Sequence, residues 1–95
     1  MSVDFVFIDS GKGGIPYMRR LLEICPAAEC VYVGDSKNFP YGEKSQQEII
    51  NLVNELCQKI IQRFAPKAII VACNTMSVNA LDELRETFPD VKFVG

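Results

Sequence analysis

Residues 68–76 are Ala68-Ile69-Ile70-Val71-Ala72-Cys73-Asn74-Thr75-Met76. The apolar run at 68–71 predicts a buried parallel strand, and apolar residues at helical spacing follow it at Ala80, Leu81, Leu84 and Phe88. The Cys73 thiol therefore stands where a strand ends and a helix begins. Backbone N–H groups and the helix dipole at such a position favour negative charge, which stabilises a thiolate. Because the chain has no histidine, this thiolate would act as nucleophile or base without an imidazole.

The same alternation of strand and helix runs through the rest of the chain. We predict strands at 3–8, 30–33, 68–71 and 91–94. We predict helices from about residue 15 to the proline at 26, from the capping-box pattern at 45–48 to the proline at 66, and from residue 74 to the proline at 89. The buried stripe of the first helix is expected to contain Met18, Leu21, Leu22 and Cys25. This order predicts an α/β fold with a parallel sheet of about four strands and flanking helices, of the flavodoxin-like, doubly wound type.

Three polar segments follow strands, at 9–14, 34–42 and 73–75. In open α/β sheets the binding site lies beyond the carboxyl ends of the strands, so these segments should converge on one edge of the sheet. The first and third strands are then expected to be neighbours. Asp9 and Ser10 open a glycine-rich turn. Besides a binding site, this turn could be purely structural or could be an anion-binding loop, although the Walker spacing is absent.

Composition limits the function classes. A chain of 95 residues is long enough for one small domain, and its net charge of −2 is dispersed, which argues against nucleic acid or an anionic membrane as partner. The sequence shows neither a signal peptide nor an apolar run of membrane-spanning length, so we expect a cytoplasmic protein. The four cysteines, at 25, 30, 57 and 73, lack metal-ligand spacing and are expected to be reduced thiols, with no metal site.

The predicted fourth strand has no helix after it. A parallel sheet needs cover on both faces, so part of one face should be exposed. We therefore expect the chain to be part of a longer protein or to need a partner.

Three motifs in register resemble those of glutamate racemases, in the aspartate/glutamate racemase family. They are Phe7-Ile8-Asp9-Ser10-Gly11-Lys12-Gly13-Gly14, then Val31-Tyr32-Val33-Gly34-Asp35-Ser36 with Pro40-Tyr41-Gly42-Glu43-Lys44-Ser45, and finally Ala72-Cys73-Asn74-Thr75. The resemblance covers essentially the whole chain and corresponds to the N-terminal part of the family.

The resemblance implies a function. Such racemases convert L-glutamate to D-glutamate for cell-wall peptidoglycan without a cofactor, using two cysteines on opposite faces of the substrate between two similar α/β domains. Cys73 would be one of the two acid/base thiols, Asp9 would assist it, and Ser10 would contact the substrate. The pocket that holds the α-amino and carboxylate groups would be lined by Pro40, Tyr41, Gly42, Asn74 and Thr75.

The chain departs from the family pattern in two ways. The second cysteine of the family lies in a Cys-Thr-His motif, which is absent here, so residues 1–95 are expected to be the N-terminal domain of a protein whose second domain is required for activity. The segment Lys37-Asn38-Phe39 also differs from the small and basic residues usual in the family. A homodimer remains an open alternative for completing the site.

Several alternatives compete with this assignment. The chain could be a non-catalytic flavodoxin-like module that binds an anion or nucleotide, or an aspartate racemase. Cys57 is expected to be core because it lies on the apolar stripe of its helix. Asn74 and Thr75 could simply cap the third helix, and Tyr41 could merely pack over its loop.

Overall fold

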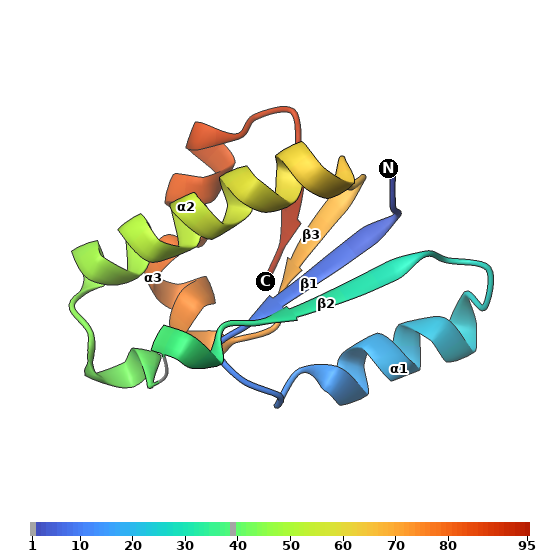
Figure 1. The fold of residues 1–95 in the computed structure, drawn as a ribbon, viewed down its shortest axis with the longest axis horizontal. Coiled ribbons are helices and arrows are strands. Elements are labelled where there is room, and N and C mark those ends of the chain that lie inside the picture. The colour runs from blue at the N-terminus through green and yellow to red at the C-terminus, as the bar shows by residue number, and fades with distance from the viewer. Residues whose placement is uncertain (1, 39) are drawn as a thin grey trace.

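The computed structural model describes residues 2–38 and 40–95, which form a parallel sheet between two layers of helices (Figure 1). The strands are β1 (Phe5–Asp9), β2 (Cys30–Gly34), β3 (Ala68–Val71) and β4 (Lys92–Val94). Their order is β2-β1-β3-β4, and every neighbouring pair is parallel. The predicted α/β class and the pairing of the first and third strands are confirmed. This order is that of a doubly wound sheet, in which the direction of winding reverses between β1 and β3.

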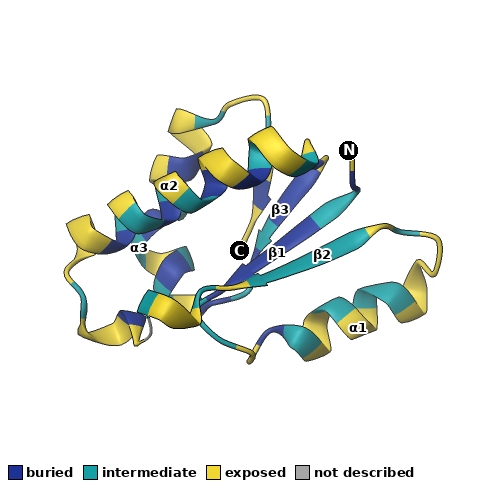
Figure 2. Ribbon diagram, in the orientation of Figure 1, coloured by how far each residue is buried: buried dark blue, intermediate teal, exposed yellow. Residues whose placement is uncertain are grey.

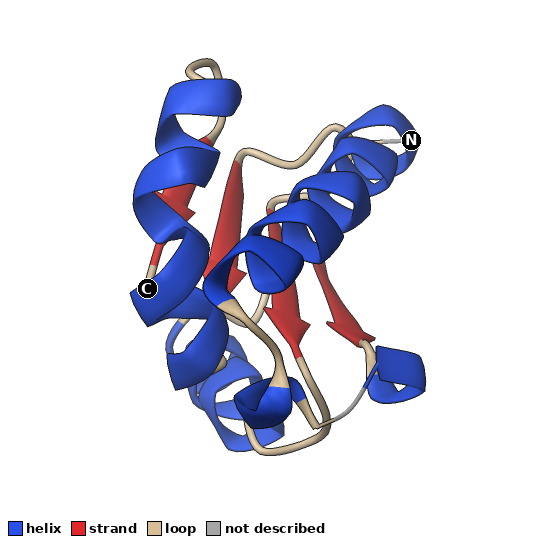
Figure 3. Ribbon diagram, turned by 90° about the vertical axis from the view of Figure 1, so that its left-hand side faces the viewer, coloured by secondary structure: helices blue, strands red, loops and turns tan. Residues whose placement is uncertain are grey.

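The helices divide unequally between the two faces of the sheet. Helices α2 (Gln46–Phe64) and α3 (Asn74–Thr87) lie on one face, and α1 (Ile15–Ile24) lies on the other (Figures 1 and 3). Two 3-10 helices, η1 (Ser36–Asn38) and η2 (Tyr41–Glu43), occupy the segment that was predicted as a polar loop.

The core lies between the sheet and the α2–α3 layer. Alternate residues of the central strands, among them Val6, Ile8, Ile69 and Val71, point into it, as the period of two in a strand requires. The helices contribute Ile49, Val53, Cys57 and Ile60 from α2, and Met76, Ala80 and Leu84 from α3. Cys57 is fully buried, so its predicted place in the core is confirmed.

Helix α2 begins and ends as its sequence predicts. The Ser45 hydroxyl accepts a hydrogen bond from the Glu48 amide at 3.2 Å, and the Glu48 carboxylate accepts one from the Ser45 amide at 3.3 Å. This is the predicted capping box, which satisfies two amides at the first turn. The helix ends at Phe64, and its C-cap residue Ala65 has a φ of 43°, in the left-handed region, directly before Pro66.

Helix α1 is less buried than its apolar pattern predicts. None of its residues, all of which the structure describes, is buried (Figure 2). Met18, Leu21 and Leu22 are half-buried, but Cys25 at its C-cap is exposed, so its predicted place in a buried stripe is wrong. The reason is that α1 is the sole helix of the described chain on its face, and no second helix closes over its far side.

The same face of the sheet is uncovered beside α1, as the sequence predicts. Tyr17 of α1 is 65% exposed and Val94 of β4 is 42% exposed. A hollow of about 310 Å³ lies here, lined by Tyr17, Ile70, Val71, Ala72, Asn74, Val94 and Gly95. Among the described residues, no helix combines the length and the apolar character needed to cross a membrane.

Candidate active site

The site is built where β1 and β3 end side by side. Ile8 is paired with Val71, and the Ala72 amide continues the ladder by donating to the Ile8 carbonyl at 2.9 Å. The next residues along the two strands bring side chains together across this edge. The Ser10 hydroxyl oxygen lies 3.4 Å from the Cys73 sulfur, within hydrogen-bonding distance for a thiol. Residues 63 positions apart in the sequence therefore touch because their strands are neighbours.

The Asp9 carboxylate is buried and organises the glycine-rich turn. It is 5% exposed and is the one charged side chain in the buried part of the described chain. One oxygen accepts from the Ser10 amide at 2.8 Å, and the other accepts from the Gly14 amide at 2.7 Å. Helix α1 has no acidic residue in its own first turn, so Asp9 supplies the negative charge that stabilises the N-terminus of this helix.

Tyr32 of β2 completes the hydrogen bonding of Asp9. Its hydroxyl donates to the carboxylate and accepts from the Gly14 amide at 3.0 Å. Burial, with the hydrogen bond to Asp9, raises the pKa of Tyr32 to about 12, so the hydroxyl remains a donor at neutral pH. Sequence reasoning missed this residue. The signal was present, because Tyr32 alternates with Val31 and Val33, which pack against the core, and so shares the sheet face of Asp9.

Gly14 is enclosed on the side where a side chain would grow. A Cβ there would lie 2.5 Å from the Cβ of Ala72 and 2.9 Å from the Tyr32 oxygen. The absence of a side chain lets the Gly14 amide reach both Asp9 and Tyr32. The turn is thereby packed against the segment that carries Cys73.

Helix α3 begins at the thiol without a side-chain cap. Cys73 is its N-cap residue, and no side chain of the described chain caps it, in contrast to the capping box of α2. The alternative that Asn74 or Thr75 caps this helix is therefore wrong. Cys73 is 9% exposed, Asn74 is exposed and Thr75 is half-buried. The first amides of α3 and these two side chains are hydrogen-bond donors at the mouth of the site.

Residues 40–42 were expected to line the substrate pocket, but the structure buries Tyr41. Tyr41 is 1% exposed, packs in the core cluster with Cys73, and donates its hydroxyl proton to Asp35. Pro40 and Gly42 are exposed, and η2 packs against α3. The residues of this segment that are open to a ligand are therefore Pro40 and Gly42, and Tyr41 is not. Phe39 lies outside the described residues.

Asp35 forms a second carboxylate–phenol pair beside the first. Burial raises the pKa of Asp35. Hydrogen bonds from Tyr41 and Asn38 together lower it by more than burial raises it, so the pKa lies below its ordinary value. Burial and the bond to Asp35 raise the pKa of Tyr41. Both tyrosines near Cys73 are therefore neutral at pH 7 and donate to carboxyl groups, Tyr32 to Asp9 and Tyr41 to Asp35.

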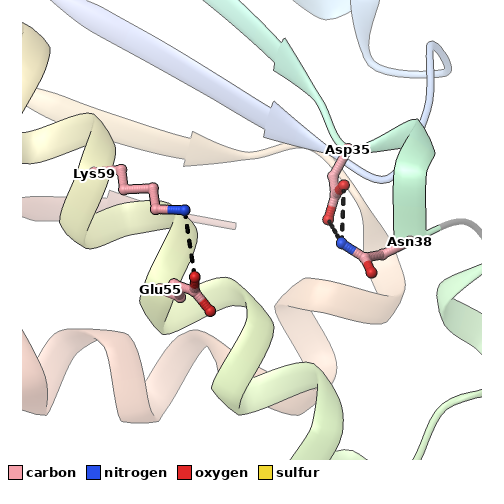
Figure 4. Close-up of polar contacts among 4 residues, drawn as sticks. All are labelled: Asp35, Asn38, Glu55 and Lys59. Carbon is pink, nitrogen blue, oxygen red and sulfur yellow. Dashed lines mark hydrogen bonds and ion pairs between the residues drawn. The ribbon is translucent and has the colours of Figure 1, made fainter.

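A separate hollow of about 320 Å³ lies away from the thiol. It is lined by Asp35, Lys37, Asn38, Leu52, Glu55, Leu56 and Lys59. Figure 4 shows two polar contacts on its wall: the Asn38 amide donates to Asp35 at 3.0 and 3.2 Å, and Lys59 pairs with Glu55 at 3.3 Å. Neither Ser10 nor Cys73 lines this hollow, so we assign it no part in the chemistry of the thiol.

The other cysteines are placed away from the Ser10–Cys73 contact. Cys57 is buried in the core, and burial raises its pKa to about 12. Burial also raises the pKa of Cys30, at the amino end of β2. Cys25 is exposed on the far end of α1. In residues 2–38 and 40–95, no group of three or more histidine, cysteine or acidic side chains is arranged to hold a metal ion.

Comparison with known proteins finds similar chains, although no family model matches. The chain is 47% identical over 81 residues to a glutamate racemase of Treponema pallidum, covering 85% of this chain and 30% of that protein. It is 44% identical over 89 residues to a glutamate racemase of Clostridium perfringens, covering 94% of this chain and 34% of that protein. The chain thus spans about a third of the length of the curated relatives it matches.

Solved structures show the same similarity in three dimensions. The Escherichia coli glutamate racemase, in complex with L-glutamate and the activator UDP-MurNAc-Ala, superposes with a TM-score of 0.90 at 35% identity, over 98% of this chain and 35% of that one. A glutamate racemase isoform of Bacillus anthracis gives a TM-score of 0.88 at 31% identity, over 98% of this chain and 34% of that one.

Proposed function

Because the chain is similar in sequence and fold to the N-terminal part of glutamate racemases, we propose that it forms one side of a cofactor-independent glutamate racemase site. The proposed reaction interconverts L- and D-glutamate, and D-glutamate serves peptidoglycan synthesis. The observation that supports it most directly is the contact of Ser10 with Cys73 at the switch point of the sheet, where doubly wound folds bind ligands.

Cys73 is the proposed acid/base on one face of the substrate. As a thiolate it removes the α-proton, and as a thiol it returns a proton to the same face. The Ser10 hydroxyl stabilises the thiolate by donating to it and contacts the substrate. The opposite face needs a second acid, which a second domain outside this chain supplies, since Cys25, Cys30 and Cys57 all lie elsewhere.

The surrounding groups would hold glutamate and stabilise the carbanion. The uncapped N-terminus of α3, with the Asn74 amide and Thr75 hydroxyl, suits the substrate carboxylate, because free amides and the helix dipole favour an anion. Asp9 assists Cys73 and offers negative charge near the substrate ammonium. Exposed Pro40 and Gly42 form the rim, and buried Tyr41 holds this segment in place through its hydrogen bond to Asp35.

A chimera tests this function. Residues 1–95 would replace the matching segment of the Clostridium perfringens relative, so that the rest of that racemase supplies the opposite face. We expect the chimera to racemise L-glutamate, measured by circular dichroism and by deuterium incorporation at the α-carbon. Cys73→Ser should reduce kcat by at least about a hundredfold, because one proton-transfer group is lost.

Cys25→Ser is the matched control, because that thiol is exposed and distant from the site. It should leave kcat and KM unchanged. A non-catalytic binding module predicts the opposite pattern, in which Cys73→Ser has no more effect than Cys25→Ser. That result would overturn the assignment of Cys73.

A further inference from the structure

We propose that Tyr32 is a positioning residue for Cys73. Its hydroxyl holds the Asp9 carboxylate so that the 9–14 turn presents the Ser10 hydroxyl to the Cys73 sulfur. The effect on the thiol stands on the contacts alone, and its importance for catalysis rests on the proposed function.

An unbroken series of hydrogen bonds links the two residues. The Tyr32 hydroxyl donates to one oxygen of Asp9, and the other oxygen accepts from the Ser10 amide at 2.8 Å. The Ser10 hydroxyl then lies 3.4 Å from the Cys73 sulfur. The two ends of this series come from β2 and from the start of α3, at opposite sides of β1. Tyr32 therefore acts on the thiol through Asp9 and Ser10.

Ionisation of the Cys73 thiol decides which atom donates in the contact between Ser10 and Cys73. While Cys73 is neutral, either the hydroxyl or the thiol can donate. A thiolate has no proton, so Ser10 must then be the donor, and a hydrogen bond to a charged group is stronger than a neutral one. A Ser10 hydroxyl held in place thus favours the thiolate. Displacement of Ser10 removes that preference.

The Tyr32 hydroxyl, rather than its ring, carries this role. It is the third donor to the Asp9 carboxylate, and it also accepts from the Gly14 amide at 3.0 Å. Without it, one oxygen keeps a single donor, and the Asp9 carboxylate and the Gly14 amide lose their side-chain tie to β2. A phenylalanine at this position would preserve the ring packing and remove only the tie.

Several other titratable groups lie around Cys73 on neighbouring elements. Asp9 comes from β1, Tyr32 from β2, Tyr41 and Asp35 from the segment after β2, and Cys57 from α2. Burial raises the pKa of Tyr32 and of Cys57 to about 12, and that of Tyr41 is also raised. None of these three groups therefore ionises below about pH 10. In that range the ionisation of the Cys73 thiol can be followed without interference from theirs.

The first experiment measures the rate of Cys73 alkylation by iodoacetamide between pH 6 and 10, with each thiol quantified by peptide mapping. We expect Tyr32→Phe and Ser10→Ala each to move the midpoint of the rate upward by about one pH unit, the shift that loss of one charge-assisted hydrogen bond produces. The double variant should shift no further than Ser10→Ala, because Tyr32 acts through Ser10. Tyr17→Phe, which removes an exposed hydroxyl, should leave the midpoint unchanged.

A purely structural role for Tyr32 gives a different outcome. Tyr32→Phe would then lower the stability of the fold but leave the midpoint where it is, or its shift would add in full to that of Ser10→Ala. Either result would overturn the proposal. The assay needs no substrate, so an inactive chimera would count against the proposed function and not against this inference.

A second measurement covers the case in which Tyr32→Phe does not fold. In the unsubstituted chain labelled with carbon-13 tyrosine, the Cζ signal of Tyr32 should change with the midpoint of Cys73, while that of exposed Tyr17 should not. The Ser10→Ala variant should lose this change. A Tyr32 signal that still follows Cys73 in Ser10→Ala would show direct electrostatic contact instead, and would contradict the proposed route.

Discussion

Gly14 is the glycine of the site turn that tolerates no side chain. A Cβ there would approach Ala72 to 2.5 Å, and the amide would be pushed away from Asp9 and Tyr32. We predict that Gly14→Ala destabilises the fold by about 1–3 kcal/mol, the usual cost of overpacking. Urea unfolding followed by far-ultraviolet circular dichroism measures the change.

Gly13→Ala is the matched control one residue away. A Cβ at Gly13 meets nothing within 4 Å, so the change should stay within about 0.5 kcal/mol. Equal losses for the two variants would mean that the turn is not packed as described.

Buried thiol and phenol groups make the fold sensitive to alkali. The pKa of Cys57 is raised from 9.0 to about 12 because the ionised thiolate would lose its hydration in the core. An acid whose pKa is raised in the folded state contributes its stability below its unfolded pKa, and that stability is lost as the pH rises toward the folded pKa. Between pH 9 and 12, Cys57 should therefore remove up to about 1.4 kcal/mol of stability per pH unit.

The alkaline prediction is checked by urea unfolding at pH 8 to 11 under reducing conditions. Stability should fall more steeply with pH in the unsubstituted chain than in Cys57→Ala, even though the variant is less stable at pH 8 because of its cavity. Tyr32, whose pKa is raised from 10.0 to about 12, should add to the loss above pH 10. Parallel pH curves for the two proteins would contradict the burial argument.

At the scale of elements, α2 depends on its capping box more than α3 depends on any cap. Ser45→Ala removes the acceptor for the Glu48 amide and should cost about 1 kcal/mol. Ser36→Ala in η1 changes an exposed serine outside any α-helix and serves as control. Thermal unfolding should separate the two variants, and an unchanged melting temperature for Ser45→Ala would disprove the contribution of the cap.

The two helix layers should differ in local stability. Helix α1 has no buried residue among those described, whereas α2 buries Ile49, Val53, Cys57 and Ile60. Because local opening is easiest where few apolar contacts are lost, amides of α1 should exchange faster than those of α2 by a factor of ten or more. Hydrogen exchange followed by mass spectrometry tests this, and equal protection of the two helices would contradict it.

At the scale of the whole molecule, the proposed racemase site has a candidate acid/base thiol on one side only within the described chain. Cys73 alone among the four cysteines lies at the carboxyl edge of β3, while Cys57 is in the core and Cys30 begins β2. Inversion at the α-carbon needs a second group on the opposite face, in a site closed to water.

We therefore predict that residues 1–95 alone show no detectable racemisation of L-glutamate, measured by loss of circular dichroism and by deuterium exchange at the α-carbon. Sedimentation in the same buffer identifies the monomer. Full racemisation by a verified monomer would refute the need for a second face. Activity confined to a dimer would instead mean that two chains complete the site.

The main features of the candidate site could be predicted from sequence because they depend on local pattern. An apolar run, then Cys73, then apolar residues at helical spacing indicate a strand, a thiol and a helix in that order. Chain connectivity then places the thiol at the junction of the strand and the helix. The burial of Cys25 was mispredicted because periodicity shows which side of a helix is apolar but not whether anything covers it. Tyr32 was missed because its partners lie on another strand.

The sequence by itself determined the order of strands and helices, the capping of α2 and the place of Cys73 at a strand end. These follow from interactions among residues a few positions apart, which hydrophobic period, prolines and caps record directly. Only the tertiary structure decided that Ser10 touches Cys73, that Tyr32 holds Asp9, and that the Tyr41 ring turns inward to Asp35. Those contacts join separate strands and loops, and they exist because parallel pairing in one register brings distant segments to a common edge.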